Sequence, residues 1–190
     1  MIPIPNDFDN ARAYDGNSMP PLPLGGHVCR VHSARTEKTR NNTDMLVIEF
    51  DVYEDGEFNR YYNRRFEAAK AYRNDAKWPG VFRANLLTRD GATNGYFKGF
   101  ITALEQSNTG YNFKATGGNE AAMRGLYVGF VFGEREFRAW DDSVKTVVEP
   151  FYAVSVAKVR EGVPIPAKKV LRDASPAQSF SPVDDDDLPF

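Results

Sequence analysis

Residues 45–54 alternate between apolar and polar side chains, and this alternation constrains the fold more than any other part of the chain. The apolar residues share one face of an extended segment: Leu46, Ile48, Phe50 and Val52. The opposite face holds Glu49, Asp51 and Tyr53. A period of two residues predicts a β-strand with one buried face and one solvent-facing side.

The other periodic segments are mostly strand-like as well. Asp55-Gly56 is a hairpin signal that leads into a return strand, and a polar turn at 141–143 joins two long strands further on. Pro150 in the last strand predicts a bulge or a sheet edge, because proline cannot donate to a β-ladder. The expected strands are residues 28–36, 45–54, 57–66, 126–139 and 145–159.

One amphipathic helix is expected over residues 95–106, with Asn94 as its N-cap. Its apolar residues follow the helical spacing: Phe97, Phe100, Ile101 and Leu104. The alanine-rich piece 67–76 is also compatible with a short helix.

The resulting order is strand, strand, strand, helix, strand, strand. It predicts an OB-fold, which is a five-stranded, partly open barrel, here with one helix between strands 3 and 4. OB-folds bind oligonucleotides across strands 2 and 3 and the loops 1–2 and 4–5. A β-sandwich is the alternative, but it would not usually place one clear amphipathic helix at that point.

A length of 190 residues suits one globular domain with extensions. We expect an irregular, proline-rich arm over 1–23 and the OB-fold over 24–162. A disordered linker rich in Pro, Ala, Ser and Asp is expected over 163–183, followed by an acidic tip over 184–190.

No catalytic constellation is evident. With Cys29 as the one cysteine and His27 and His32 as the two histidines, the chain offers neither an internal disulfide nor a structural zinc site. One carboxylate cluster could in principle bind the metal of a nuclease, but it alternates as the outer face of a strand and no lysine follows it at a catalytic spacing. That cluster is Glu49, Asp51 and Glu54. There is no phosphate-binding glycine loop either, so we expect no enzyme activity and no cofactor.

The chain opens without a charged and apolar leader, and it holds no run of about 18 apolar residues. We therefore expect a soluble, intracellular protein without a membrane partner.

The net charge of the whole chain is only −2, but its distribution is uneven. Residues 60–89 contain eight basic and two acidic side chains, so this segment has a net charge of +6. Aromatic residues lie between the basic ones. Single-stranded nucleic acid needs cations for its phosphates and flat rings for its unpaired bases. Of the aromatic residues, we assign Phe66 and Phe82 to the core. We expect Tyr61, Trp78 and the arginines to lie at the surface. The predicted DNA-binding residues here are Arg60, Tyr61, Arg64, Arg65, Arg73, Lys77 and Trp78.

Two further basic clusters fall in the loops that an OB-fold uses for binding. The first loop carries Arg35, Lys38 and Arg40. The turn between the last two strands is surrounded by Arg135, Arg138, Trp140 and Lys145.

The chain closes with four carboxylates that run into Leu-Pro-Phe, and the terminal phenylalanine adds its own α-carboxylate. A solvated tail has no reason to carry exposed Leu and Phe, whereas a partner with an apolar pocket ringed by Lys or Arg would capture them. The predicted partner-binding residues are Asp184, Asp185, Asp186, Asp187, Leu188, Pro189 and Phe190.

This ending closely resembles the acidic tip of the bacterial single-stranded DNA-binding proteins. The segment Gly125-Leu126-Tyr127-Val128-Gly129 is similar to the glycine-rich opening of that family's fourth strand. The long insertion over 67–94 and the N-terminal arm depart from the family, and the chain is closer in these features to divergent phage-encoded members. Because phage relatives differ in assembly, these departures put the family's tetramer in doubt for this chain.

The resemblance implies a non-catalytic protein that coats single-stranded DNA in replication, recombination and repair. It also implies that the tip recruits replication and recombination proteins, in a bacterial cytoplasm or nucleoid. Homo-oligomers are compatible with it. Two alternatives remain open: a phage recombination or annealing mediator, and an OB-fold adaptor that binds proteins but no nucleic acid.

Overall fold

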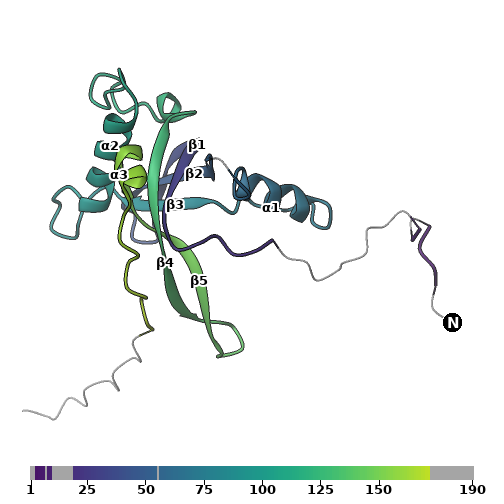
Figure 1. Cartoon of the computed structure of the whole chain (residues 1–190). Coiled ribbons are helices and arrows are strands. Elements are labelled where there is room, and N and C mark those ends of the chain that lie inside the picture. Colours follow the sequence, from purple (N-terminus) through teal and green to yellow (C-terminus); the bar gives the residue numbers. More distant parts are fainter. Residues whose placement is uncertain (1–2, 7, 10–18, 55, 172–190) are drawn as a thin grey trace, which may run out of the picture.

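The computed structural model describes residues 3–6, 8–9, 19–54 and 56–171. Its centre is one antiparallel sheet of five strands in the order β3-β2-β1-β4-β5, and the sheet is not closed (Figure 1). The prediction of a mainly β protein is therefore confirmed. The strands are β1 (Gly25–Lys38), β2 (Asp44–Val52), β3 (Val81–Asn85), β4 (Tyr127–Arg138) and β5 (Val144–Val154).

The prediction of a single helix was wrong. Besides α2 (Gly95–Ser107), the described chain forms α1 (Tyr61–Lys70), the short 3₁₀ helix η1 (Glu120–Met123) and α3 (Val156–Glu161). Residues 156–159 had been expected to end the last strand. They form a helix because the Ser155 side chain accepts a hydrogen bond from the backbone of Lys158 at 3.4 Å and caps a helical turn.

The predicted return strand over 57–66 is also wrong, because α1 occupies most of it. Arg60 adopts a left-handed conformation with φ 55° and turns the chain into the helix. The Asp51 carboxylate, which belongs to β2, then accepts hydrogen bonds from the backbone N–H groups of Tyr62 at 2.8 Å and Asn63 at 3.2 Å. A carboxylate of the preceding strand thus satisfies free N–H groups of the first helical turn.

The third strand is β3, which begins after Gly80. The backbone N–H of Phe50 donates to the carbonyl of Gly80 at 2.9 Å, so the ladder between β2 and β3 starts at this glycine. A Cβ at position 80 would overlap the Phe50 carbonyl and the Tyr62 ring, so only glycine fits there.

The helix α2 covers the core face of the sheet, as its apolar spacing predicts. Its expected N-cap is confirmed, since the Asn94 side chain accepts a hydrogen bond from the backbone of Tyr96 at 2.9 Å. The rings of Phe50, Phe82, Phe100 and Phe130 meet between the helix and the sheet, with Phe130 in the middle. Cys29 is buried, as predicted.

The opposite side of the sheet, which we call the outer face, is covered only in part. Here α3 and the segment that follows it pack on β1 and β4. The packing is so close at Gly26 that a Cβ on this residue would lie 2.6 Å from the side chain of Val163. Residues 163–171, the beginning of the predicted linker, lie against β4: the backbone of Lys169 bonds to Glu134 and Glu136 at 2.8 and 2.9 Å. The β4–β5 hairpin extends well past the other strands (Figure 1).

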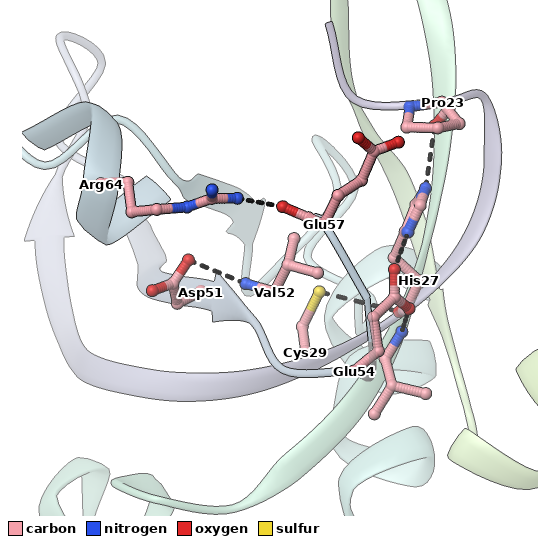
Figure 2. A network of polar contacts seen from close by, with 9 residues as sticks. Pro23, His27, Cys29, Asp51, Val52, Glu54, Glu57 and Arg64 are labelled. Atoms are coloured by element: carbon pink, nitrogen blue, oxygen red, sulfur yellow. Dashed lines mark hydrogen bonds and ion pairs between the residues drawn. The ribbon is translucent and has the colours of Figure 1, made fainter. Parts of the chain in front are cut away.

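The N-terminal arm is attached to this domain through His27. The Nδ1 atom of the His27 ring lies 2.7 Å from the Glu54 carboxylate, and Nε2 donates to the carbonyl of Pro23 at 2.9 Å (Figure 2). Burial alone would lower the pKa of His27, but the hydrogen bonds to Glu54 and Pro23 and the charge of Glu54 together raise it. Both ring nitrogens face acceptors, so the arrangement favours the charged imidazolium.

We expect His27→Gln to destabilise the protein at acidic pH by about 1.5–3 kcal/mol, the range for a hydrogen bond to a charged group. Because the folded-state pKa of His27 lies above its unfolded value, this stabilisation is complete below about pH 6.5 and disappears as pH rises through the folded-state pKa. Urea unfolding of wild type and variant between pH 5.5 and 9 measures the difference. Glu54→Gln should remove the same pH dependence, and an unchanged profile in both variants would contradict the assignment.

Candidate nucleic-acid interface

The first predicted cluster lies where β1 turns into β2, and most of its charge is neutralised. Arg35 pairs with Glu37 at 2.6 Å and with Glu49 at 2.8 Å, and these hydrogen bonds raise the pKa of Arg35. Lys38 pairs with Asp44 at 2.8 Å. Arg40 is exposed in the turn and has no carboxylate within ion-pair distance among the described residues. Of this cluster, Arg40 is therefore the residue best suited to bind a phosphate.

The second cluster lies on and beside α1, and it keeps more of its charge. Arg60 donates to the side chain of Asn63 at 2.8 Å, and Arg64 donates to the backbone carbonyl of Glu57 (Figure 2). Arg65 donates to the Tyr61 hydroxyl at 3.1 Å. None of these three arginines has an ion-pair partner in the described part of the chain, so their charges remain available to an anion.

Four further residues were predicted for this cluster or near it. Tyr61 is only 2% exposed, so its ring belongs to the core and the prediction of a surface position was wrong. Arg73 pairs with Asp75 at 3.5 Å, whereas Lys77 is exposed beyond the helix. Trp78 is half-buried: its Nε1 donates to the Phe50 carbonyl at 2.9 Å, and its ring stacks on His32 with centroids 4.4 Å apart. Phe82 is buried, as predicted, but Phe66 is half-buried beside Trp78.

The third cluster lies on the β4–β5 hairpin. Arg135 forms a two-bonded pair with Glu149 at 2.7 and 2.9 Å, and Lys145 lies 3.6 Å from Asp141. Arg138 donates to the carbonyl of Asp142 at 3.4 Å. Trp140, at the turn of the hairpin, is 95% exposed. A ring this exposed contributes nothing to the core and is free to contact a ligand.

The three clusters do not form one patch. β1 and β4 are antiparallel and pair only between Gly25–Arg30 and Tyr127–Phe132. The rest of β1 therefore extends beyond one end of this paired region, and the rest of β4 extends beyond the other end. The turn 39–43 and the turn 139–143 therefore lie at opposite ends of the sheet, and α1 lies beside β2. Between the two turns, the outer face carries further candidate residues that sequence reasoning missed: Arg30, His32, Tyr53 and Tyr127.

The predicted acidic tip, Asp184 to Phe190, lies outside the described residues. Within the described ranges, no group of three or more His, Cys, Asp and Glu side chains could hold a metal ion. No helix in those ranges has the length and apolar character needed to cross a membrane.

No protein-family model matches this chain, and no curated protein is significantly similar to it.

The two tryptophans should respond differently to alanine substitution. Trp140→Ala should weaken binding of single-stranded oligonucleotides by roughly 5- to 150-fold and leave the melting temperature unchanged, because its exposed ring is available for stacking. Trp78→Ala should lower the melting temperature, because it removes the hydrogen bond to Phe50 and the contact with His32. Oligonucleotide titration and thermal unfolding of both variants test this. The opposite pattern would assign the stacking role to Trp78.

Proposed function

We propose that this protein is a non-catalytic single-stranded DNA-binding protein that coats exposed strands in replication and recombination. One observation carries the proposal: cations without a carboxylate partner lie on the outer face, on and beside α1 and in the turn 39–43, and exposed aromatic rings lie on the outer face and at the turn 139–143. The cations without such a partner among the described residues include Arg30, Arg40, Arg60, Arg64, Arg65 and Lys77. The exposed rings include Tyr53, Tyr127 and Trp140.

This combination suits single strands better than duplexes. A phosphate backbone requires only positive charge, which either form of DNA would engage. Exposed rings add binding energy only where a base presents an unpaired flat face. The aromatic residues therefore favour the single-stranded form.

We further propose that the sheet is an OB-type barrel opened between β3 and β5. Its five antiparallel strands, its two long hairpins and the helix α2 between β3 and β4 support this proposal. In OB-folds, nucleic acid lies across strands 2 and 3 and contacts the loops 1–2 and 4–5. The turns 39–43 and 139–143 take these two places here.

Recruitment of other proteins is the second part of the proposed function. Segment 184–190 combines four aspartates with Leu188, Pro189 and Phe190. The acidic residues would steer the segment toward a basic surface, and the apolar residues would anchor it in a pocket. The proposed partners are replication and recombination proteins.

A titration of fluorescent dT oligonucleotides at 50 and 200 mM salt tests the binding function. If four arginines each neutralise one phosphate, affinity should fall roughly 50-fold over this range, since the salt slope is about −0.7 per phosphate for single strands. Duplex of the same length should bind more weakly. Arg64→Gln should reduce the salt slope, whereas the matched change Arg73→Gln should have less effect because Asp75 already neutralises Arg73.

Absence of binding at low salt would reject the proposal and favour a protein-binding adaptor. Equal affinity for duplex and single strand would show that the aromatic residues do not contact bases. An annealing mediator would additionally accelerate the renaturation of complementary strands.

A further inference from the structure

Three strands bring one arginine and two tyrosines together on the outer face. Arg30 lies in β1 directly opposite Tyr127, the first residue of β4. Tyr53 follows β2 and continues beside β1, because its backbone N–H donates to the carbonyl of Val28 at 2.8 Å. We call these three residues the Arg–Tyr cluster.

The rings of the cluster hold the guanidinium of Arg30 in place. Its Cζ atom lies 5.4 Å from the ring centroid of Tyr53 and 5.8 Å from that of Tyr127. The two rings are 5.8 Å apart with an angle of 62° between their planes. The Nε of Arg30 also donates to the carbonyl of Gly125 at 3.0 Å, which uses one of its five donors.

The backbone around the cluster is fixed as well. The Asn108 side chain donates to the Tyr127 carbonyl at 2.7 Å and accepts from the Tyr127 N–H at 2.9 Å. Gly125 has φ 83°, and a Cβ there would lie 3.3 Å from a terminal nitrogen of Arg30. The cluster is therefore held in one geometry before any ligand arrives, which lowers the ordering cost of binding.

The cluster is open to solvent and positively charged. Tyr53 is 42% exposed and Tyr127 is 36% exposed. Arg30 has no carboxylate within ion-pair distance in the described ranges, unlike Arg35 and Arg135, whose partners lie at 2.6 to 2.8 Å. A purely structural cluster would bury its rings or neutralise its charge. This one offers flat aromatic faces beside an uncompensated guanidinium.

We infer that the Arg–Tyr cluster binds one nucleotide of a single strand. The base stacks on an exposed tyrosine face, and the adjacent phosphate accepts hydrogen bonds from the outward N–H groups of Arg30. The guanidinium repels metal ions, and a simple anion would not need two exposed rings. The cluster also lies along β1 between the turn 39–43 and α3, which covers Gly26 and Gly129, so a strand that follows β1 from the turn 39–43 along the outer face reaches the cluster. This inference rests on the proposed function.

Photo-crosslinking with the full chain locates the base directly. A dT oligonucleotide that carries 5-iododeoxyuridine should crosslink to peptides that contain Tyr53 or Tyr127. Crosslinks found only elsewhere, for example at Trp140, would overturn the inference while the proposed function stands. Absence of any oligonucleotide binding would instead reject the proposed function.

Substitutions provide the second test. Tyr53→Ala and Tyr127→Ala should each weaken dT oligonucleotide binding, with a loss of roughly 5- to 150-fold for the ring on which the base stacks. Tyr53→Phe should bind like wild type, because it keeps the ring. Arg30→Lys should weaken binding several-fold, because lysine keeps the charge but lacks the planar fork.

Tyr96→Ala is the matched control. Tyr96 is 55% exposed, but it lies on α2, on the core side of the sheet. Its removal should leave binding unchanged. Melting temperatures identify any variant that loses affinity by unfolding. If folded Tyr53→Ala, Tyr127→Ala and Arg30→Lys proteins all bind like wild type, the inference is wrong.

Discussion

Phe130→Ala should lower the free energy of unfolding by about 3–5 kcal/mol, the range for removing a fully buried phenylalanine. Phe130 is completely buried in β4, and its ring centroid lies 4.4 Å from that of Phe50 and 5.0 Å from that of Phe82. It also stacks on Phe100 of α2 at 6.1 Å. The substitution therefore leaves a cavity where β2, β3, β4 and α2 meet. Urea unfolding at constant pH measures the loss.

Tyr72→Ala provides the control, because Tyr72 is a similarly large ring that is 61% exposed beside α1. It should change stability by less than about 0.5 kcal/mol. Phe130→Leu should cost less than Phe130→Ala, since it refills part of the cavity. A small effect of Phe130→Ala would mean that α2 does not close the core as described.

The parts of the fold that could be predicted are those with a local signal. An apolar period is visible in the sequence of four strands and one helix: β1, β2, β4, β5 and α2. Asn94 also marks the start of α2. The start of α1 could not be found this way, because the carboxylate that accepts from the N–H groups of its first turn is Asp51, which belongs to β2. The five residues of β3 alternate, but Phe82 and Ala84 are its only buried side chains and only Phe82 is large, so the alternation is a weak signal in the sequence.

The sequence shows which basic and aromatic residues are candidates for the site, but not which of the basic residues are neutralised by a carboxylate. Counting basic residues identified three candidate regions, yet Glu49 and Glu149 neutralise Arg35 and Arg135 across strand pairs. A sequence count cannot show such pairing, because it depends on register. The Arg–Tyr cluster was missed for the same reason: its residues come from three strands, and Arg30 and Tyr127 are 97 positions apart.

Removing segment 184–190 should abolish capture of partner proteins and leave the melting temperature unchanged, because the described buried core lies between Leu22 and Ser155. Single-strand affinity should stay the same or rise several-fold at low salt. The segment begins 13 residues after Leu171, a reach of at most about 45 Å. Residues 163–171 run parallel to β4 toward the turn 139–143. We therefore expect the four aspartates to compete with phosphates for the cations that lie within this reach.

Two variants separate the charge of the tip from its apolar anchor. Changing Asp184–Asp187 to Asn should raise single-strand affinity at low salt, and this gain should shrink as salt screens the competition. Changing Leu188 and Phe190 to Ala should leave DNA affinity closer to wild type but eliminate partner capture from a bacterial extract, since the apolar residues supply the anchor. A free peptide with the sequence of residues 181–190 should release the captured proteins. If the same proteins remain bound to the truncated chain, or the peptide releases none, the segment is not the docking element. If the Asn variant gains no affinity at any salt concentration, the acidic residues do not compete for the DNA-binding surface.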